Sequence, residues 1–171
     1  MATVRTRARF HRALTSGETV LARSVFGGAI RLDTVRILSA PWPFNRAFVP
    51  GGWFGRDWIV WPTAQLPDDI SRASVALQAL LVHELVHVWQ VQQGVNLLIA
   101  KIRAGDSFAS YRYPLDCPSW AALNIEQQAS LVEHRFRLAH GGTVPGNAAF
   151  YDRVCPFPKP SVSPHGLEGK T

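Results

Sequence analysis

The stretch that decides the fold is LLVHELVHVWQ, residues 80–90. Inside this apolar run, His83, Glu84 and His87 form the pattern H-E-x-x-H. Residues four apart lie on one face of a helix, so both imidazoles can offer a nitrogen to one Zn²⁺. Glu84 can reach a water on the metal but is poorly placed to ligate it. The motif therefore predicts two zinc ligands and one general base, the set that metal-assisted hydrolysis requires.

The alternative is that these three residues are polar side chains of an ordinary core helix. Their neighbours in the run are all apolar: Leu80, Leu81, Val82, Leu85, Val86 and Val88. Without a ligand, burial of three polar groups there would cost about 1–3 kcal/mol each. Because metal ligation removes that cost, we favour the zinc site.

A catalytic zinc site needs a third protein ligand and keeps a fourth position open. The metzincin pattern requires Gly at position 90 and His at position 93, and both are Gln here, so that class is excluded. We expect the third ligand to be Glu126 on a following helix. Glu133 and His134, one or two turns further on, are the next candidates. A solvent-facing helix carboxylate is the alternative interpretation of Glu126.

The patterns on both sides of the motif predict an α+β domain. Thr15 and Glu18 have capping-box spacing, which predicts a helix over 16–26. The longest predicted helix begins near Asp68, Asp69 or Ser71 and ends at Gly94. The remaining expected elements are a strand within 33–40, short strands over 47–49 and 57–61 joined by a Gly-rich turn, a helix to about 103, and a helix within 119–142.

We divide the chain into a basic arm (1–13), a zincin-like metallopeptidase domain (14–142) and a Pro-rich tail (143–171). The tail is expected to be extended and to pack in part through Phe150 and Tyr151. The two cysteines, Cys117 and Cys155, cannot make a disulfide framework. A single bridge and two free thiols both remain open.

The composition indicates which classes of partner are favoured. Its 171 residues carry a formal net charge of +6, which hints at an acidic partner. Zinc-finger spacing and RNA-binding aromatic patterns are missing from the sequence, so nucleic acid is disfavoured as the main partner. Much of the excess charge lies in an arm expected to be solvated, at Arg5, Arg7, Arg9 and Arg12.

Localisation is predicted from the apolar stretches. None reaches the length of a membrane span, and no apolar region follows the basic N-terminus as a Sec signal would require. We therefore expect a cytoplasmic protein or one that is exported by a non-Sec secretion system.

Four segments together resemble a known family. They are SGETVLARSVFG (16–27), VRI (35–37), LLVHELVHVWQ (80–90) and NIEQQA (124–129). The chain from about 14 to 140 resembles the zinc metallopeptidase domain associated with extracellular contractile injection systems, in its Vgr-related branch. The resemblance implies a compact gluzincin: a small β-sheet packed on an active-site helix, with a second helix that carries the ligand Glu126. It also implies a secretion-machinery partner.

Two details of the expected site stay open. Larger gluzincins often place an Asp four residues after the ligand Glu, to hold a ligand His in one tautomer, but here that residue is Ser130. The side chain that would stabilise an oxyanion is also undecided among Tyr111, Tyr113 and His140.

The leading functional hypothesis is a zinc-dependent peptidase that acts on a peptide or protein substrate. Glu84 would take a proton from the metal-activated water and pass a proton to the leaving amine. The alternative is a non-catalytic, zinc-stabilised accessory protein of a secretion system. An intact Glu84 favours the enzyme, because a purely structural zinc site needs no general base.

Overall fold

The fold is described from a computed structural model, which covers residues 10–105 and 108–159 apart from the side chains of Ala104, Phe108 and Ala109. The expectations for Arg5, Arg7, Arg9 and the last residues of the tail lie outside that range. The division of the chain into three segments stays a prediction.

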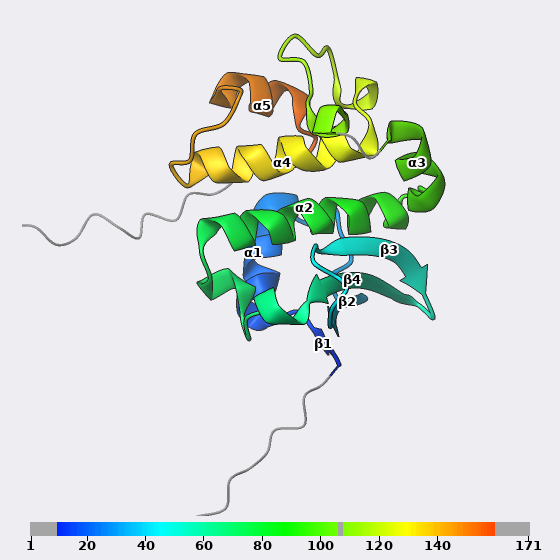
Figure 1. The fold of residues 1–171 in the computed structure, drawn as a ribbon. Helices are drawn as coiled ribbons and strands as arrows, with labels where there is room; N and C mark the ends of the chain where they lie inside the picture. The colour runs from blue at the N-terminus through cyan, green and yellow to red at the C-terminus, as the bar shows by residue number, and fades with distance from the viewer. Residues whose placement is uncertain (1–9, 106–107, 160–171) are drawn as a thin grey trace, which may run out of the picture.

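The architecture is α+β, with one small mixed sheet and five α-helices in the described residues. The strands are β1 (His11–Ala13), β2 (Val35–Ala40), β3 (Phe48–Trp53) and β4 (Arg56–Pro62). The helices are α1 (Ser16–Phe26), α2 (Val75–Gln92), α3 (Leu97–Ala104), α4 (Ile125–Ala139) and α5 (Ala148–Val154). Figure 1 shows α2 between the sheet and α4, with α5 on the far side of α4.

The sheet has the strand order β1-β2-β4-β3. β2 and β4 are parallel, and the two outer strands run antiparallel to their neighbours. The predicted Gly-rich turn is wrong in detail, because Gly51 and Gly52 lie in β3 and the hairpin turns at Phe54 and Gly55. Both turn residues have positive φ (54° and 68°), the conformation that a tight two-residue hairpin requires. Pro50 is tolerated because β3 is an edge strand.

α2 is buried around most of its circumference, as its apolar composition predicts. One side packs on the sheet and the other on α4. Its start was predicted too early, because Ser74 caps it, while Asp69 caps a short 3₁₀ turn over Ile70–Arg72. The polar residues of the motif are therefore carried by the central helix of the core.

Two expectations about the ends of the domain are corrected. Arg12 does not lie in a solvated arm: it follows His11 in β1 and pairs with the buried carboxylate of Glu18, at 2.6 and 2.7 Å. The segment after Gly142 is not simply extended, because Ala148–Val154 form α5, capped by Asn147. Sequence periodicity missed both elements because they are short and are stabilised by tertiary contacts.

Two further expectations about the fold are confirmed in the described residues, and one open alternative is resolved. The capping box of Thr15 and Glu18 begins α1. Phe150 and Tyr151 are buried against the core. Cys117 and Cys155 are both free and buried, which resolves the open alternative in favour of two thiols. No helix in the part of the chain that the structure describes is both long and apolar enough to cross a membrane.

Candidate metal centre

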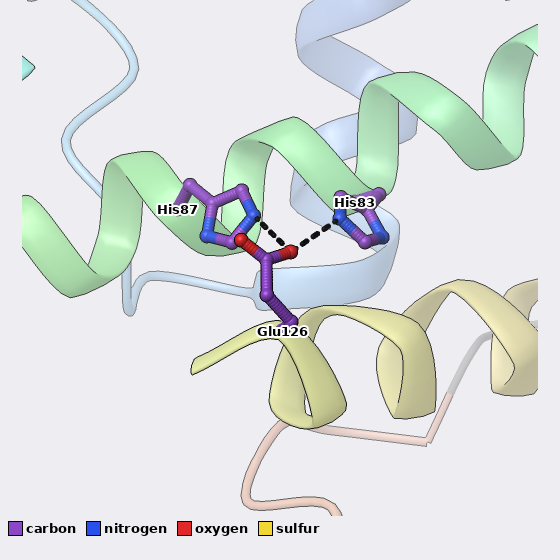
Figure 2. Close-up of side chains that lie close together, drawn as sticks. All are labelled: His83, His87 and Glu126. Atoms are coloured by element: carbon purple, nitrogen blue, oxygen red, sulfur yellow. Dashed lines mark hydrogen bonds and ion pairs between the residues drawn. The ribbon is translucent and has the colours of Figure 1, made fainter. Parts of the chain in front are cut away.

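The site forms where α2 and α4 face each other. His83 and His87 lie one turn apart on α2, and Glu126 lies in the first turn of α4 (Figure 2). Asn124 fixes this end of α4 by a capping box with Gln127, so the carboxylate of Glu126 is held opposite the histidines. All three site residues are buried. The fold thus brings together the three residues that the sequence predicted as ligands.

The spacing of the three side chains suits a tetrahedral metal ion. The Oε2 atom of Glu126 lies 3.2 Å from His87 Nε2 and 3.5 Å from His83 Nε2. Candidate ligand atoms of the three residues all lie within 4.8 Å of one another. Tetrahedral zinc with bonds of about 2.0–2.1 Å places its ligand atoms roughly 3.3 Å apart. Two nitrogens and one carboxylate oxygen are also a donor set that zinc accepts, and they leave a fourth position open.

The outer nitrogen of His87 has a defined hydrogen-bond role. Its Nδ1 lies 2.8 Å from Gln90 Oε1. The amide nitrogen of Gln90 donates to the carbonyl oxygen of Ile125 (3.1 Å) and to Gln128 Oε1 (2.9 Å), which fixes the orientation of that amide. Gln90 Oε1 can therefore only accept, and His87 Nδ1 carries the proton.

His83 is oriented in the same way by a carboxylate. Its Nδ1 lies 3.1 Å from Glu133 Oε2, so this nitrogen is also the donor. In the neutral tautomers, both Nε2 atoms then present lone pairs toward the carboxylate of Glu126. Three acceptors that converge in a buried site repel one another unless a cation lies between them or the rings are protonated. The hydrogen-bond network thus prepares the group to hold a cation.

The same electrostatics appear in the pKa values of the metal-free group. Burial lowers the pKa of His83, but hydrogen bonds to Glu126 and Glu133 outweigh it and raise that pKa to about 9. Burial raises the pKa of Glu126, yet the two histidines outweigh it and hold that pKa well below its usual range. Lys101 Nζ, 3.5 Å from Glu126 Oε1, adds to this effect. A positive charge is therefore favoured at the centre of the site.

Glu84 lies beside this group, on a cavity of about 1350 Å³. The cavity is also lined by His83, His87 and Glu126. The negative charge of Glu84 contributes to the raised pKa of His83, which places the carboxylate within electrostatic range of the site. Within the described residues, its buried Oε2 atom has no hydrogen-bond partner. An unpaired buried carboxylate oxygen is suited to accept a proton from a bound water.

The three candidates for the oxyanion stabiliser differ in their positions and hydrogen bonds. The hydroxyl of Tyr113 lies in a chain of hydrogen bonds, 2.9 Å from Tyr151 Oη and 2.5 Å from His134 Nδ1. His140 does not line the cavity, and its Nδ1 bonds the carbonyl oxygen of Phe136. Tyr111 and Tyr113 both line the cavity, and the ring of Tyr111 lies 6.3 Å from that of His83. Two of the three candidates, Tyr111 and Tyr113, therefore line the same cavity as the histidines.

The structure also assigns residues whose roles the sequence did not show. Glu133 was the next candidate for the third ligand, but it contacts the outer nitrogen, Nδ1, of His83. It therefore orients this imidazole, the role for which the sequence offers only Ser130 at the position where larger gluzincins often place an Asp. Gln90 orients His87 from the same helix, and its spacing three residues after His87 is a signal in the sequence for this contact. The approach of Lys101 to Glu126 could not be foreseen, because it depends on how α3 folds back.

Comparison with known proteins places the chain in a family. No protein-family model matches it. Over 140 residues it is 34% identical to the type VI secretion system spike protein VgrG2b of Pseudomonas aeruginosa, a match that covers 73% of this chain but 13% of that protein. Its fold matches the effector domain of P. aeruginosa VgrG2b with a TM-score of 0.62 and 32% identity, over 83% of this chain and 78% of that domain. The chain belongs to the VgrG2b effector-domain family.

Membership in the VgrG2b effector-domain family agrees with the Vgr-related branch that the sequence motifs indicated. The chain spans only about an eighth of the full VgrG2b spike protein, since 13% of that protein is matched. The shared unit is therefore the effector domain rather than the whole spike.

Proposed function

We propose that this protein is a zinc-dependent peptidase with a compact gluzincin-type fold. The observation that carries the proposal is the convergence of His83 Nε2, His87 Nε2 and Glu126 Oε2 in a buried group whose outer hydrogen bonds turn their lone pairs inward. The buried and unpaired oxygen of Glu84 on the adjoining cavity adds the general base. Together they supply the parts that hydrolysis of a peptide bond requires.

His83, His87 and Glu126 would hold the zinc ion, which when bound polarises a carbonyl and lowers the pKa of a coordinated water. Glu84 accepts the proton of the attacking water and later gives a proton to the leaving amine. Glu133 and Gln90 hold the two imidazoles in the tautomer that binds metal. Tyr111 is our candidate for stabilising the oxyanion.

The relatives suggest where such an enzyme would act. VgrG2b is, by its name, a spike protein of a type VI secretion system. We therefore propose that this protein is linked to secretion machinery and is exported by a non-Sec route, with a peptide or protein as its substrate. The competing proposal is a non-catalytic accessory protein in which zinc only stabilises the fold.

The first test is metal content combined with single substitutions. Protein purified without chelator should carry about one zinc per chain by elemental analysis, and His83→Ala or His87→Ala should abolish it. Glu84→Gln should retain zinc and the wild-type melting temperature, because Glu84 is not a ligand. Protein without zinc that also binds none on addition would overturn the metal site.

The second measurement separates the enzyme from the accessory protein. Cleavage of a broad peptide library should be at least about 10²–10⁴-fold slower for Glu84→Gln than for wild type, the usual effect of losing a general base. Equal cleavage by both proteins would refute the role of Glu84. A zinc-loaded wild-type protein that cleaves nothing would favour the accessory protein.

A further inference from the structure

His83, His87 and Glu126 are called the metal group below. The cavity beside them has walls to which the proposed catalytic mechanism assigns no role. It is lined from the β2–β3 connection, α2, α3, the segment 111–115 and α4. Its volume of about 1350 Å³ exceeds what a single side chain fills, so it can receive several residues of an extended peptide.

One feature of these walls is exposed apolar surface. Four large apolar side chains line the cavity and still face water, with exposed fractions of 47% for Phe44, 69% for Leu98, 73% for Ile102 and 49% for Leu115. They come from three separate segments of the chain, and the cavity brings them together. A ligand with a large apolar side chain would remove this surface from water, which is favourable at about 25 cal/mol per Å².

The second feature is the distribution of charge. The lining includes three carboxylates, and all of them belong to the metal group or its surroundings: Glu84, Glu126 and Glu133. Two of these are already balanced, since Glu126 faces both histidines and Lys101, while Glu133 faces His83 and Arg137.

Away from His83, His87, Glu126 and their partner Lys101, the charged side chains of the lining in the described residues are Arg46 and Arg112, and both are basic. Arg112 is exposed, and its backbone carbonyl accepts a hydrogen bond from Gln127 at 2.7 Å, which ties it to α4. The charged side chains of these walls are thus positive, and a positive recess attracts an acidic ligand.

We propose that this cleft binds a peptide segment in which a large apolar side chain is followed or preceded within a few residues by an acidic one. The apolar side chain packs on Ile102 and its neighbours, and the carboxylate faces Arg112. This inference deepens the proposed function by naming its substrate class, and its binding half can be tested without any cleavage.

The test uses zinc-loaded Glu84→Gln protein, which does not consume the probe. The probes are fluorescein-labelled octapeptides of Ala and Gly with one central Leu and, at each nearby position in turn, Glu, Gln or Lys. By fluorescence anisotropy at low salt, the best Glu peptide should bind roughly two- to fivefold tighter than its Gln counterpart, and the Lys peptide more weakly. The difference should shrink as salt is added.

Matched variants on the same background identify the surfaces. Arg112→Glu should reverse the preference between the Glu and Lys peptides. Arg103→Glu makes the same charge change at an exposed residue of α3 that does not line the cavity, and should leave the preference in place. Ile102→Gln should lower the binding affinity for the Leu peptides roughly three- to tenfold. Ile99→Gln, at an exposed position outside the cavity, should leave that affinity unchanged.

Equal binding of Glu, Gln and Lys peptides would overturn the inference, as would equal effects of Arg103→Glu and Arg112→Glu. A third outcome would also overturn it: the protein binds phosphatidylglycerol vesicles, Ile102→Gln abolishes that binding, and peptides bind no better than background. The walls would then be a membrane-docking surface. If the acidic peptides bind as expected but wild type cleaves none of them, the inference stands and the peptidase proposal fails.

Discussion

His83 is the residue whose protonation should control metal binding. Its pKa in the metal-free protein is raised to about 9 by Glu126 and Glu133 against the effect of burial, so the ring is charged at neutral pH. The ring nitrogen must lose its proton to bind zinc, and the proton is released most easily at high pH. Apparent zinc affinity should therefore rise about tenfold per unit from pH 6.5 to 8, measured by competition with a chromophoric chelator.

A control for this pH dependence is Glu133→Gln. The amide still meets His83 Nδ1 but carries no charge, so the pKa of His83 falls toward its ordinary value of 6.5. The zinc affinity of this variant should depend less steeply on pH above 7. An affinity of the wild type that does not change with pH would show that the ring is neutral in the metal-free protein.

At the scale of elements, α1 is joined to β1 and to the turn before α2 through one buried carboxylate. Glu18 accepts hydrogen bonds from both terminal nitrogens of Arg12, from the backbone N–H of Thr15 (2.9 Å) and from that of Ile70 (2.9 Å). Glu18→Gln replaces one acceptor oxygen by a donor that faces other donors. The free energy of unfolding in urea should fall by about 3–5 kcal/mol, the usual cost of breaking a buried ion pair.

The matched substitution for Glu18→Gln is Asp33→Asn, which makes the same acid-to-amide change at an exposed residue between α1 and β2. It should change the free energy of unfolding by no more than about 0.5 kcal/mol. If the two variants were equally stable, the carboxylate of Glu18 would not be what joins these elements.

At the scale of the whole molecule, the metal group joins α2 to α4, the two helices that form the centre of the core. Free zinc at 100 times its dissociation constant should stabilise the protein by about 2.7 kcal/mol. For a domain of this size that raises the melting temperature by roughly 5–10 °C, which differential scanning calorimetry with and without a chelator can measure.

Two controls accompany the calorimetry. Zinc should not stabilise Glu126→Ala, which has lost the ligand from α4. Mg²⁺ should not stabilise the wild type, since this ion prefers oxygen ligands and the group offers two nitrogens. A melting temperature that does not change when the wild type binds zinc would mean that the unfolded chain holds the metal as tightly as the folded one.

The sequence by itself determined the features that depend on local periodicity and chemistry. The capping box of Thr15 and Glu18 predicts α1, and the uninterrupted apolar run around His83 and His87 predicts a buried helix. The sequence also offered Glu126 on the following helix as the expected third ligand, and the structure brings it to the two histidines. Helix geometry fixes that His83 and His87 share a face, whereas the approach of Glu126 depends on the packing of α4 on α2.

Only the tertiary structure decided how distant segments meet. It assigned Glu133 and Gln90 to the outer nitrogens of the histidines and brought Lys101 to Glu126. It also showed that Arg12 pairs with Glu18 in the fold instead of lying in solvent, and that α5 forms within a Pro-rich segment. These features depend on contacts between segments far apart in the chain or on packing against the core, and no local pattern of residues encodes them.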